Sequence, residues 1–380
     1  MDAWAGPEAA APAPALGTAR TLGVEEEFLL VDATTTAAAA RADEVEAALD
    51  DGIRGQLRRE FHASQLEMAT GVNTDLDALR REVAELRRAA ATAAATVGCR
   101  LLAVGTAPVA TGPPPPVTDD PRYARMVERF GAVADTPGLC GCHVHVGVPD
   151  RELAVQVCNH LRPWLPVLQA MTANSPFADG RDTGYASWRS VLFGHWPSTG
   201  PPPYLRDLAE YQVTVDRMVA TGLMLDEGMI YWYARPSATY PTVEVRVGDV
   251  CPTPADTTLV AGLIRGLVAT VLDDVVAGRP APDVPDGLLA AAHWRAAHDG
   301  LEGDGVDAVT GAVSPAWELV EGLYRRVAPA LADHGDLATV RDLLDELRER
   351  GSGARRQRAA RHEGGLQAVL ALLADQTSDR

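Results

Sequence analysis

Four segments of the 380-residue sequence carry ionisable or amide side chains two positions apart. The four pairs are Glu25 and Glu27, Gln65 and Glu67, His143 and His145, and Glu244 and Arg246. Apolar residues surround each pair, and side chains two positions apart on a β-strand share a face, so each pair is predicted to lie on a polar strand face. Two carboxylates about 7 Å apart on one face repel each other, which predicts either a wet face or a cation between them.

These residue types are the ligands of a divalent-metal site. Carboxylate-rich ligation with a histidine suits Mg²⁺ or Mn²⁺ better than Zn²⁺, and magnesium held by carboxylates typically binds nucleotide phosphates. Arg246 shares a face with Glu244, so its planar guanidinium is suited to a phosphate; a plain ion pair with Glu244 or Asp249 is the alternative. Glu26 points to the other face, toward solvent or an arginine.

Two further candidates are less direct. Glu60 precedes Glu67 by seven positions, which places it on the opposite face of a straight strand, so it joins the cluster only if the chain bends or bulges. Cys140 and Cys142 form a C-x-C pair that a metal could use, but the favoured interpretation is small buried residues beside a strand. The five cysteines form no disulfide framework, which indicates a reducing, cytoplasmic setting.

Composition excludes several function classes. A net charge of −18 argues against a nucleic-acid partner. All 34 basic residues are arginine, so neither a P-loop lysine nor a Schiff-base lysine is present. Metal ions and arginine must therefore neutralise the phosphates of any bound nucleotide. Residues 257–276 are strongly apolar but contain Arg265 and two aspartates, which predicts a buried helix rather than a membrane span.

The surrounding pattern predicts an α+β fold. Strands are expected over 22–31, 64–70, 100–106, 140–148, 229–235 and 242–248. Helices are expected over 75–97 with Thr74 as its cap, 121–131, 151–172, 204–221, 254–277, 286–299, 315–332, 336–350 and 363–374. Strands and helices do not alternate regularly and the strands have one polar face, which favours a mostly antiparallel sheet with one open face. We expect a disordered Ala/Pro-rich leader over 1–20, a single domain over 21–350 with a helical C-terminal part, and a partly helical tail over 351–380.

The motifs that carry these residues resemble those of the type 2 glutamate–cysteine ligases, or carboxylate–amine ligases, which are distant relatives of glutamine synthetase. The resembling stretches are GVEEEFLLVD, SQLEMATGV, AVGTAP, GCHVHVGVPD, ASWRSVLFGHWPSTGPP and ARPSATYPTVEVRVGD, in this order. The resemblance implies a glutamine-synthetase-like catalytic fold: a curved, mostly antiparallel, six-stranded sheet with helices on its outer face and the site on its inner face.

Carried over residue by residue, the resemblance implies a role for each candidate. The implied metal ligands are Glu25, Glu27, Glu60, Glu67, His143 and Glu244. Arg246 would stabilise the transferring phosphoryl group, and His145 would lie near the nucleotide. Arg235 and Arg189 match positions that bind phosphate or the amino-acid carboxylate, Arg235 being counted as catalytic. Gln65 and Arg189 are assigned to substrate binding.

The implied reaction uses ATP and Mg²⁺ or Mn²⁺. ATP phosphorylates a substrate carboxylate, and an amine then attacks the acyl phosphate to give an amide, ADP and phosphate. Glutamate and cysteine are the namesake substrates, yet nothing in the sequence selects cysteine over another amine.

The resemblance also suggests a homodimer acting on small molecules, with no membrane partner. The alternatives are a metallohydrolase that activates water with the same cluster and a non-catalytic nucleotide- or metal-binding relative.

Overall fold

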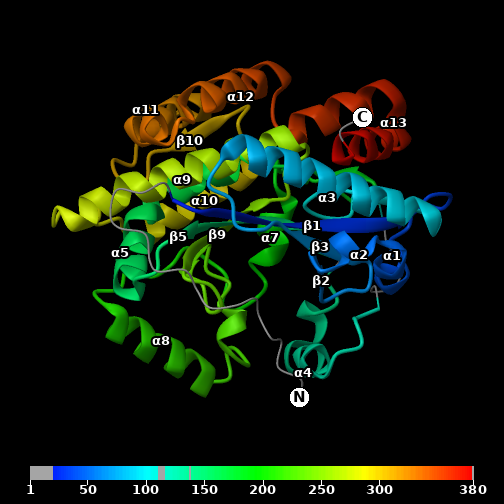
Figure 1. Cartoon of the computed structure of the whole chain (residues 1–380), viewed down its shortest axis with the longest axis horizontal. Helices are drawn as coiled ribbons and strands as arrows, with labels where there is room; N and C mark the ends of the chain where they lie inside the picture. The colour runs from blue at the N-terminus through cyan, green and yellow to red at the C-terminus, as the bar shows by residue number, and fades with distance from the viewer. Residues whose placement is uncertain (1–19, 110–115, 137, 379–380) are drawn as a thin grey trace.

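A seven-stranded antiparallel sheet forms the centre of the computed structural model, which describes residues 20–109, 116–136 and 138–378 (Figure 1). Its strands lie in the order β2 (Leu57–Arg59), β3 (Gln65–Ala69), β1 (Leu22–Asp32), β5 (Gly141–Gly147), β9 (Thr242–Asp249) and β8 (Ala234–Pro236), while β4 (Cys99–Leu102) pairs with the end of β1. The predicted mostly antiparallel sheet is confirmed. The added strand is β2. The strand predicted over 229–235 begins only at Ala234 and is preceded by a 3₁₀ turn at Glu227–Met229.

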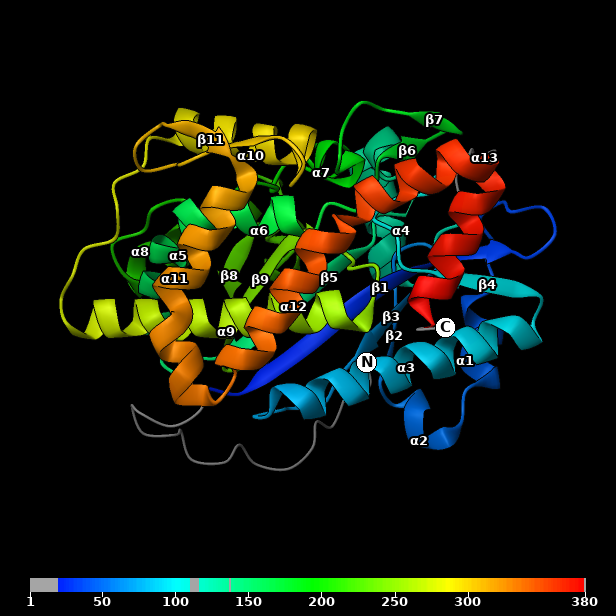
Figure 2. The ribbon, with the colours of Figure 1, turned by 90° about the horizontal axis from the view of Figure 1, so that it is seen from above.

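Helices cover one face of this sheet in two layers (Figures 1 and 2). The inner layer, which contacts the sheet, contains α3 (Leu76–Thr96), α5 (Arg151–Leu161), α6 (Leu165–Met171), α9 (Pro254–Val276) and α13 (Gly353–Thr377). The outer layer contains α11 (Ala316–His334) and α12 (Leu337–Arg350), which pack on α9. Three more helices, α4 (Pro121–Phe130), α7 (Trp188–Phe193) and α8 (Leu208–Ala220), lie toward the other side, and α10 (Asp286–Asp299) packs on α6. The two main helical layers therefore leave the polar strand face uncovered, and residues of α4 and α7 lie at its edge.

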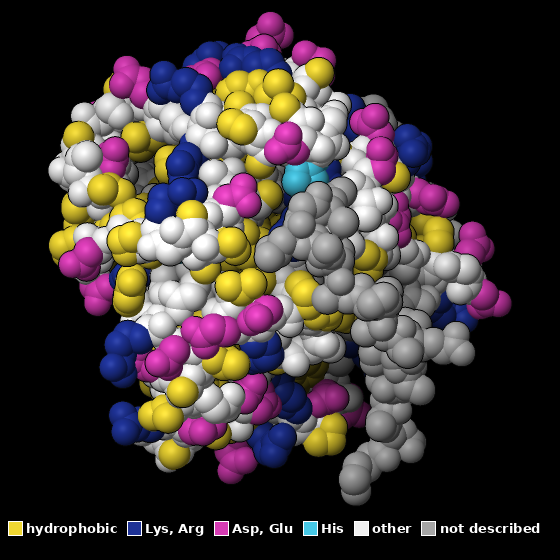
Figure 3. All heavy atoms as spheres, turned by 60° about the vertical axis from the view of Figure 1, so that its left-hand side comes forward, with side chains coloured by type: hydrophobic (Ala, Val, Ile, Leu, Met, Phe, Trp, Pro, Cys, Tyr) yellow, Lys and Arg dark blue, Asp and Glu magenta, His cyan; other side chains and the backbone are white. Residues whose placement is uncertain are grey.

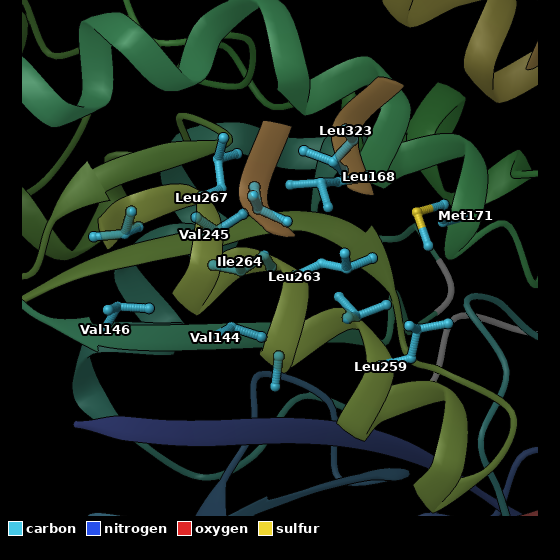
Figure 4. Close-up of a cluster of buried hydrophobic side chains, with 14 of the residues drawn as sticks. Val144, Val146, Leu168, Met171, Val245, Leu259, Leu263, Ile264, Leu267 and Leu323 are labelled. Atoms are coloured by element: carbon cyan, nitrogen blue, oxygen red, sulfur yellow. The ribbon is translucent and has the colours of Figure 1, made fainter. Parts of the chain in front are cut away.

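The main hydrophobic core lies between the sheet and α9. Val144 and Val146 of β5 and Val245 of β9 pack against leucine and isoleucine side chains of α9 (Figure 4). These valines alternate with the polar residues of the same strands. Burial of each large apolar side chain stabilises the fold by about 1.5–3 kcal/mol, and burying the valine face therefore also fixes the orientation of the polar face. The predicted buried helix is confirmed as α9, in which the fully buried Arg265 pairs with Asp336.

Several helix boundaries differ from the sequence predictions for identifiable reasons. The helix predicted over 151–172 is divided into α5 and α6 by a 3₁₀ turn at Arg162–Trp164, because Pro163 and Pro166 cannot donate backbone hydrogen bonds. Asp75, not Thr74, caps α3 by accepting the N–H of Ala78. The helix predicted over 363–374 is the second half of α13, which is kinked at Gly364 and Gly365. The elements not predicted are all short: α1 (Ala42–Ala48), α2 (Asp51–Arg54), α7, and the two-stranded sheets β6 (Phe177–Ala178) with β7 (Arg181–Asp182) and β10 (Asp304–Val306) with β11 (Val313–Pro315).

The ends of the chain bear on the predicted organisation. The leader predicted over 1–20 lies outside the described residues except for Arg20. The predicted tail contains α13, whose Leu370 and Leu373 are buried in the second hydrophobic cluster, beside β1 and β4. Of the helices that the structure describes, none combines the length and apolarity needed to cross a membrane. On the face shown in Figure 3, acidic and basic side chains are intermixed.

Candidate active site

The strand register brings the predicted pairs into one row across the open face. Glu67 of β3 lies opposite Glu27 of β1, and Glu25 lies opposite His143 of β5. His145 lies opposite Glu244 of β9, and Glu244 lies opposite Arg235 of β8. Directly opposite residues on antiparallel strands have Cβ atoms about 4.5–5.5 Å apart, so residues remote in sequence become neighbours.

A β-bulge interrupts this row beside Arg246. Between the pairs Cys142–Gly248 and Val144–Val245, β5 advances by two residues while β9 advances by three. His143 therefore faces two residues of β9, of which Arg246 is one. Such bulges re-aim side chains and are frequent next to active sites.

A cavity of about 300 Å³ opens above the row. Its lining includes every residue predicted for the site: Glu25, Glu27, Glu60, Gln65, Glu67, His143, His145, Arg189, Arg235, Glu244 and Arg246. Glu60 reaches the cavity from the loop between β2 and β3, where the chain leaves the sheet after Arg59. This loop is the bend that the seven-residue spacing required.

Three carboxylates in the cavity hold protons more tightly than usual. Burial raises the pKa of Glu67 well above its ordinary value, and the charges of Glu25, Glu60 and Glu27 raise it further. Burial is also the main cause of the raised pKa values of Glu27 and Glu60. The like charges of Glu27 and Glu67, directly opposite each other, are destabilising without a counter-charge. A bound cation would remove this penalty.

Two other carboxylates have basic side chains as neighbours. Burial would raise the pKa of Glu25, but hydrogen bonds with His143 and His145 outweigh it and the pKa is lowered. His143 Nδ1 lies 3.4 Å from Glu25, and His145 Nε2 lies 3.5 Å from it. Burial likewise opposes ionisation of Glu244, yet the charges of Arg246 and Arg235 lower its pKa well below the ordinary value.

The cluster fits a divalent cation on the chemistry of its donors. One group of ligand atoms, from Glu25, His143 and Glu244, lies within 4.8 Å of one another, and so does a second group from Glu27, Glu67 and His143. The Nε2 atom of His143 is buried and has no hydrogen-bond partner among the described residues, although Glu27 lies 3.7 Å away. Carboxylate oxygens with one imidazole match the preference of Mg²⁺ and Mn²⁺.

The arginines of the cavity differ in their partners. Arg235 donates from Nε to Glu244 (2.8 Å) and from Nη1 to the carbonyl oxygen of Ile230 (2.7 Å). Arg246 donates from Nη1 to the same Glu244, so the ion pair considered from the sequence does form. Arg189 comes from α7 instead, and its nearest carboxylate oxygen belongs to Asp249, 4.0 Å from Nη1.

The remaining sequence candidates occupy simpler positions. Gln65 donates from Nε2 to the carbonyl oxygen of Leu139 (3.2 Å) and lines the cavity. His145 is oriented by Thr242, whose hydroxyl lies 2.9 Å from Nδ1. Cys140 and Cys142 are free and packed in hydrophobic clusters, as the interpretation of small buried residues predicts.

Sequence reasoning missed an aromatic wall on one side of the cavity. Phe61 contacts Tyr123 and Trp196 edge to face, with ring centroids 5.4 and 6.1 Å apart, and Trp196 contacts Tyr231 at 5.7 Å. These residues come from loops and short helices, where no periodicity marks them. Aromatic residues make up only 5% of the chain, and several of them lie near the motifs. This local enrichment was the available signal in the sequence.

Comparisons with known proteins agree with this geometry. The model of glutamate–cysteine ligase family 2 matches residues 21–371. A relative from Salinispora arenicola, named "Putative glutamate--cysteine ligase 2", is 58% identical over 359 residues, which cover 94% of this chain and 95% of the relative.

Two solved structures share the fold at low sequence identity. A bifunctional glutathione synthetase from Pasteurella multocida superimposes with a TM-score of 0.67 at 17% identity, covering 96% of this chain and 53% of that one. A glutamate–cysteine ligase from Francisella tularensis in complex with AMP gives a TM-score of 0.65 at 13% identity, covering 95% of this chain and 89% of that one. With the family match over most of the sequence, the chain belongs to glutamate–cysteine ligase family 2 and is an ATP-dependent carboxylate–amine ligase.

Proposed function

We propose that the chain joins the side-chain carboxylate of an amino acid to an amine through an acyl phosphate, with glutamate and cysteine as the first pair to test. The observation that supports this proposal most directly is the row of cross-strand pairs, which brings four glutamates, two histidines and Arg235 together in one cavity with Glu60 and Arg246. The pair of substrates is taken from the name of the Salinispora arenicola relative.

The metal ligands in this proposal are Glu25, Glu27, Glu60, Glu67, His143 and Glu244. Bound Mg²⁺ or Mn²⁺ would neutralise the phosphates of ATP and the charge that develops during phosphoryl transfer. The five carboxylates supply the negative charge that such a cation needs, and His143 belongs to both groups of ligand atoms.

The cationic side chains then act on the substrates. Arg246 donates to the equatorial oxygens of the transferring phosphoryl group. Arg235 fixes the position of the Glu244 side chain and, like Arg246, partly neutralises its negative charge. His145, fixed by Thr242, faces the nucleotide. Arg189, with Gln65, binds the amino-acid substrate at the other end of the row.

The two steps need no nucleophile from the protein. A carboxylate oxygen of the substrate attacks the γ-phosphorus, the bond to the β-phosphate oxygen breaks, and ADP leaves. The amine nitrogen then attacks the acyl carbon, the bond to the phosphate oxygen breaks, and the nitrogen loses a proton. The aromatic wall limits access of water to the acyl phosphate. The family match does not favour the metallohydrolase alternative.

A coupled assay of ADP release tests the proposal. Purified protein is incubated with ATP and Mg²⁺ or Mn²⁺, and with each substrate alone or both together. ADP release is expected only when carboxylate and amine are both present, with one phosphate released per amide formed. Release of AMP and pyrophosphate would contradict the acyl phosphate, and turnover without an amine would contradict amide formation.

Two further features belong to this proposal. A cytoplasmic location agrees with five free cysteines and with the need for ATP. A homodimer is implied by the family resemblance and stays a prediction, which light scattering on the purified protein would test.

A further inference from the structure

Asp249 ends strand β9 behind the cavity wall and is almost completely buried, with an exposed fraction of 1%. Its Oδ2 accepts hydrogen bonds from the backbone N–H of Asn174 (2.9 Å) and the hydroxyl of Ser175 (2.7 Å). Its Oδ1 accepts the hydroxyl of Ser187 (2.8 Å). Three donors satisfy the carboxylate, although it does not line the cavity itself.

Two of these donors hold the backbone around Arg189. The hydroxyl of Ser175 accepts the N–H of Arg189 at 3.0 Å. Ser187 caps α7 by accepting the N–H of Ser190 at 3.2 Å. Because each hydroxyl donates to Asp249 and accepts from α7, the carboxylate fixes the first turn of the helix that carries Arg189.

The Arg189 side chain and the Asp249 carboxylate each occupy a space that a glycine leaves open. A Cβ atom on Gly141, the cross-strand partner of Asp249, would collide with Arg189 Nη2. A Cβ atom on Gly105 would lie 2.7 Å from the Asp249 carboxylate. The guanidinium of Arg189 lies over the Phe193 ring, 5.0 Å from its centroid, so the ring packs against one face of the guanidinium.

Among the described residues, Arg189 is also the cavity arginine that has no carboxylate partner closer than 4.0 Å. Arg235 and Arg246 pair with Glu244, and Arg122 pairs with Asp226 at 2.9 Å. Within the described residues, the buried Nε of Arg189 has no hydrogen-bond partner, and its nearest carboxylate, 4.0 Å away, is already satisfied by its three donors.

We propose that Asp249 is a positioning residue that aims Arg189 at a carboxylate of the amino-acid substrate, an inference that rests on the proposed ligase function. Asp249→Asn keeps the shape of the side chain, but it removes the charge and replaces one acceptor oxygen with a donor. The Ser175 hydroxyl, the Ser187 hydroxyl or the Asn174 N–H then loses its acceptor, and the first turn of α7 is no longer held in position. The KM for the carboxylate substrate should rise at least about tenfold, while kcat and the KM for ATP change less than about threefold.

A double-mutant cycle separates positioning from a general structural effect. Arg189→Lys and Asp249→Asn should not add in the double variant, because Asp249 acts through Arg189. Ser175→Ala, a milder change of the same network, should raise the same KM in the event that Asp249→Asn folds poorly. Asp336→Asn is the matched control: it breaks a buried ion pair with Arg265 remote from the cavity and should leave both KM values unchanged.

The outcomes distinguish this inference from the proposed function. If wild type shows no turnover with any substrate pair, the proposed function fails; a crystal structure of Asp249→Asn then still tests positioning, which predicts a displaced Arg189 guanidinium. If wild type turns over but Asp249→Asn raises the KM for ATP, acts additively with Arg189→Lys, or leaves Arg189 in place, the positioning role is wrong.

Discussion

Glu26 and Arg87 form a buried, two-pronged ion pair on the helix side of β1, with Arg87 Nε 2.8 Å from Oε2 and Nη2 2.5 Å from Oε1. Arg87, from α3, also donates to the carbonyl oxygens of Cys251 (2.8 Å) and Pro252 (3.0 Å). The hydroxyl of Thr257 donates to Glu26 Oε1 at 2.6 Å. The middle glutamate of the Glu25–Glu27 run thus connects the sheet to two helix-side segments, and Glu26 points toward an arginine rather than solvent.

Removing Arg87 should destabilise the protein strongly. Arg87→Met leaves the Glu26 carboxylate buried without its partner, which costs about 3–5 kcal/mol in the free energy of unfolding. The double variant Glu26→Leu with Arg87→Met should lose less than Arg87→Met, because no unpaired charge remains. Urea unfolding of Glu26→Leu, Arg87→Met and the double variant measures this. Arg88→Met, at an exposed position of the same helix, is the control and should stay within about 0.5 kcal/mol of wild type. Costs that simply add would contradict coupling between Glu26 and Arg87.

Neutralising one of the proposed metal ligands should abolish turnover without unfolding the protein. Glu27→Gln and Glu244→Gln each remove a charge that the proposed cation needs, so ADP release should fall at least about 100-fold. Added Mn²⁺ should raise the melting temperature of wild type and raise that of the variants less, because the cation stabilises only the state that binds it. Glu85→Gln, at an exposed position of α3, should behave as wild type in both measurements. Near wild-type turnover in both ligand variants would rule out the proposed metal set.

Arg246→Lys should slow turnover more than it weakens ATP binding. Lysine keeps the charge but loses the planar fork, so an interaction made in the transition state is weakened. We expect kcat to fall at least about tenfold, or roughly 1.4 kcal/mol of barrier, with the KM for ATP little changed. Steady-state kinetics at saturating carboxylate and amine measure both constants. A sharp rise in the KM for ATP at unchanged kcat would make Arg246 a ground-state binder. Unchanged kinetics would leave it only its ion pair with Glu244.

His293 should make the fold sensitive to acid. It is buried in α10, where Nδ1 lies 2.5 Å from the Gln169 side-chain oxygen, and burial lowers its pKa to about 3. An unfolded histidine has a pKa of about 6.5, so below that pH the unfolded state binds a proton that the folded state does not. Stability contributed by this residue is therefore present above pH 6.5 and is lost as pH falls toward 3, by up to about 1.4 kcal/mol per pH unit.

Urea unfolding between pH 7 and pH 4.5 measures this dependence. His293→Asn keeps an N–H donor for Gln169 and should flatten the slope of stability against pH, even if it lowers stability at pH 7. His362→Asn, at an exposed position of α13, serves as the control and should keep the wild-type slope. An unchanged slope in His293→Asn would show that other groups dominate the acid response.

Strand faces were predictable from the sequence because alternation along a strand is local. A period of two residues places Glu25 and Glu27 on one face of their strand and Glu26 on the other. The same period places the valines beside His143 and His145 on the other face of that strand. The buried nature of α9 also followed from its composition, and the ligand types indicated a divalent cation before any neighbour was known. The roles of individual side chains came from the family resemblance rather than from spacing.

The tertiary structure decided which of these faces meet. Pairing of β1 with both β3 and β5 places Glu25 opposite His143, 118 residues away, and this register depends on the whole core and not on either strand. Glu60 enters the cavity because the chain leaves the sheet after β2, which no periodicity encodes. Arg87 as the partner of Glu26 and Asp249 as the support of Arg189 likewise depend on contacts between distant segments, since a buried charge is satisfied by whichever group the fold brings within hydrogen-bond distance.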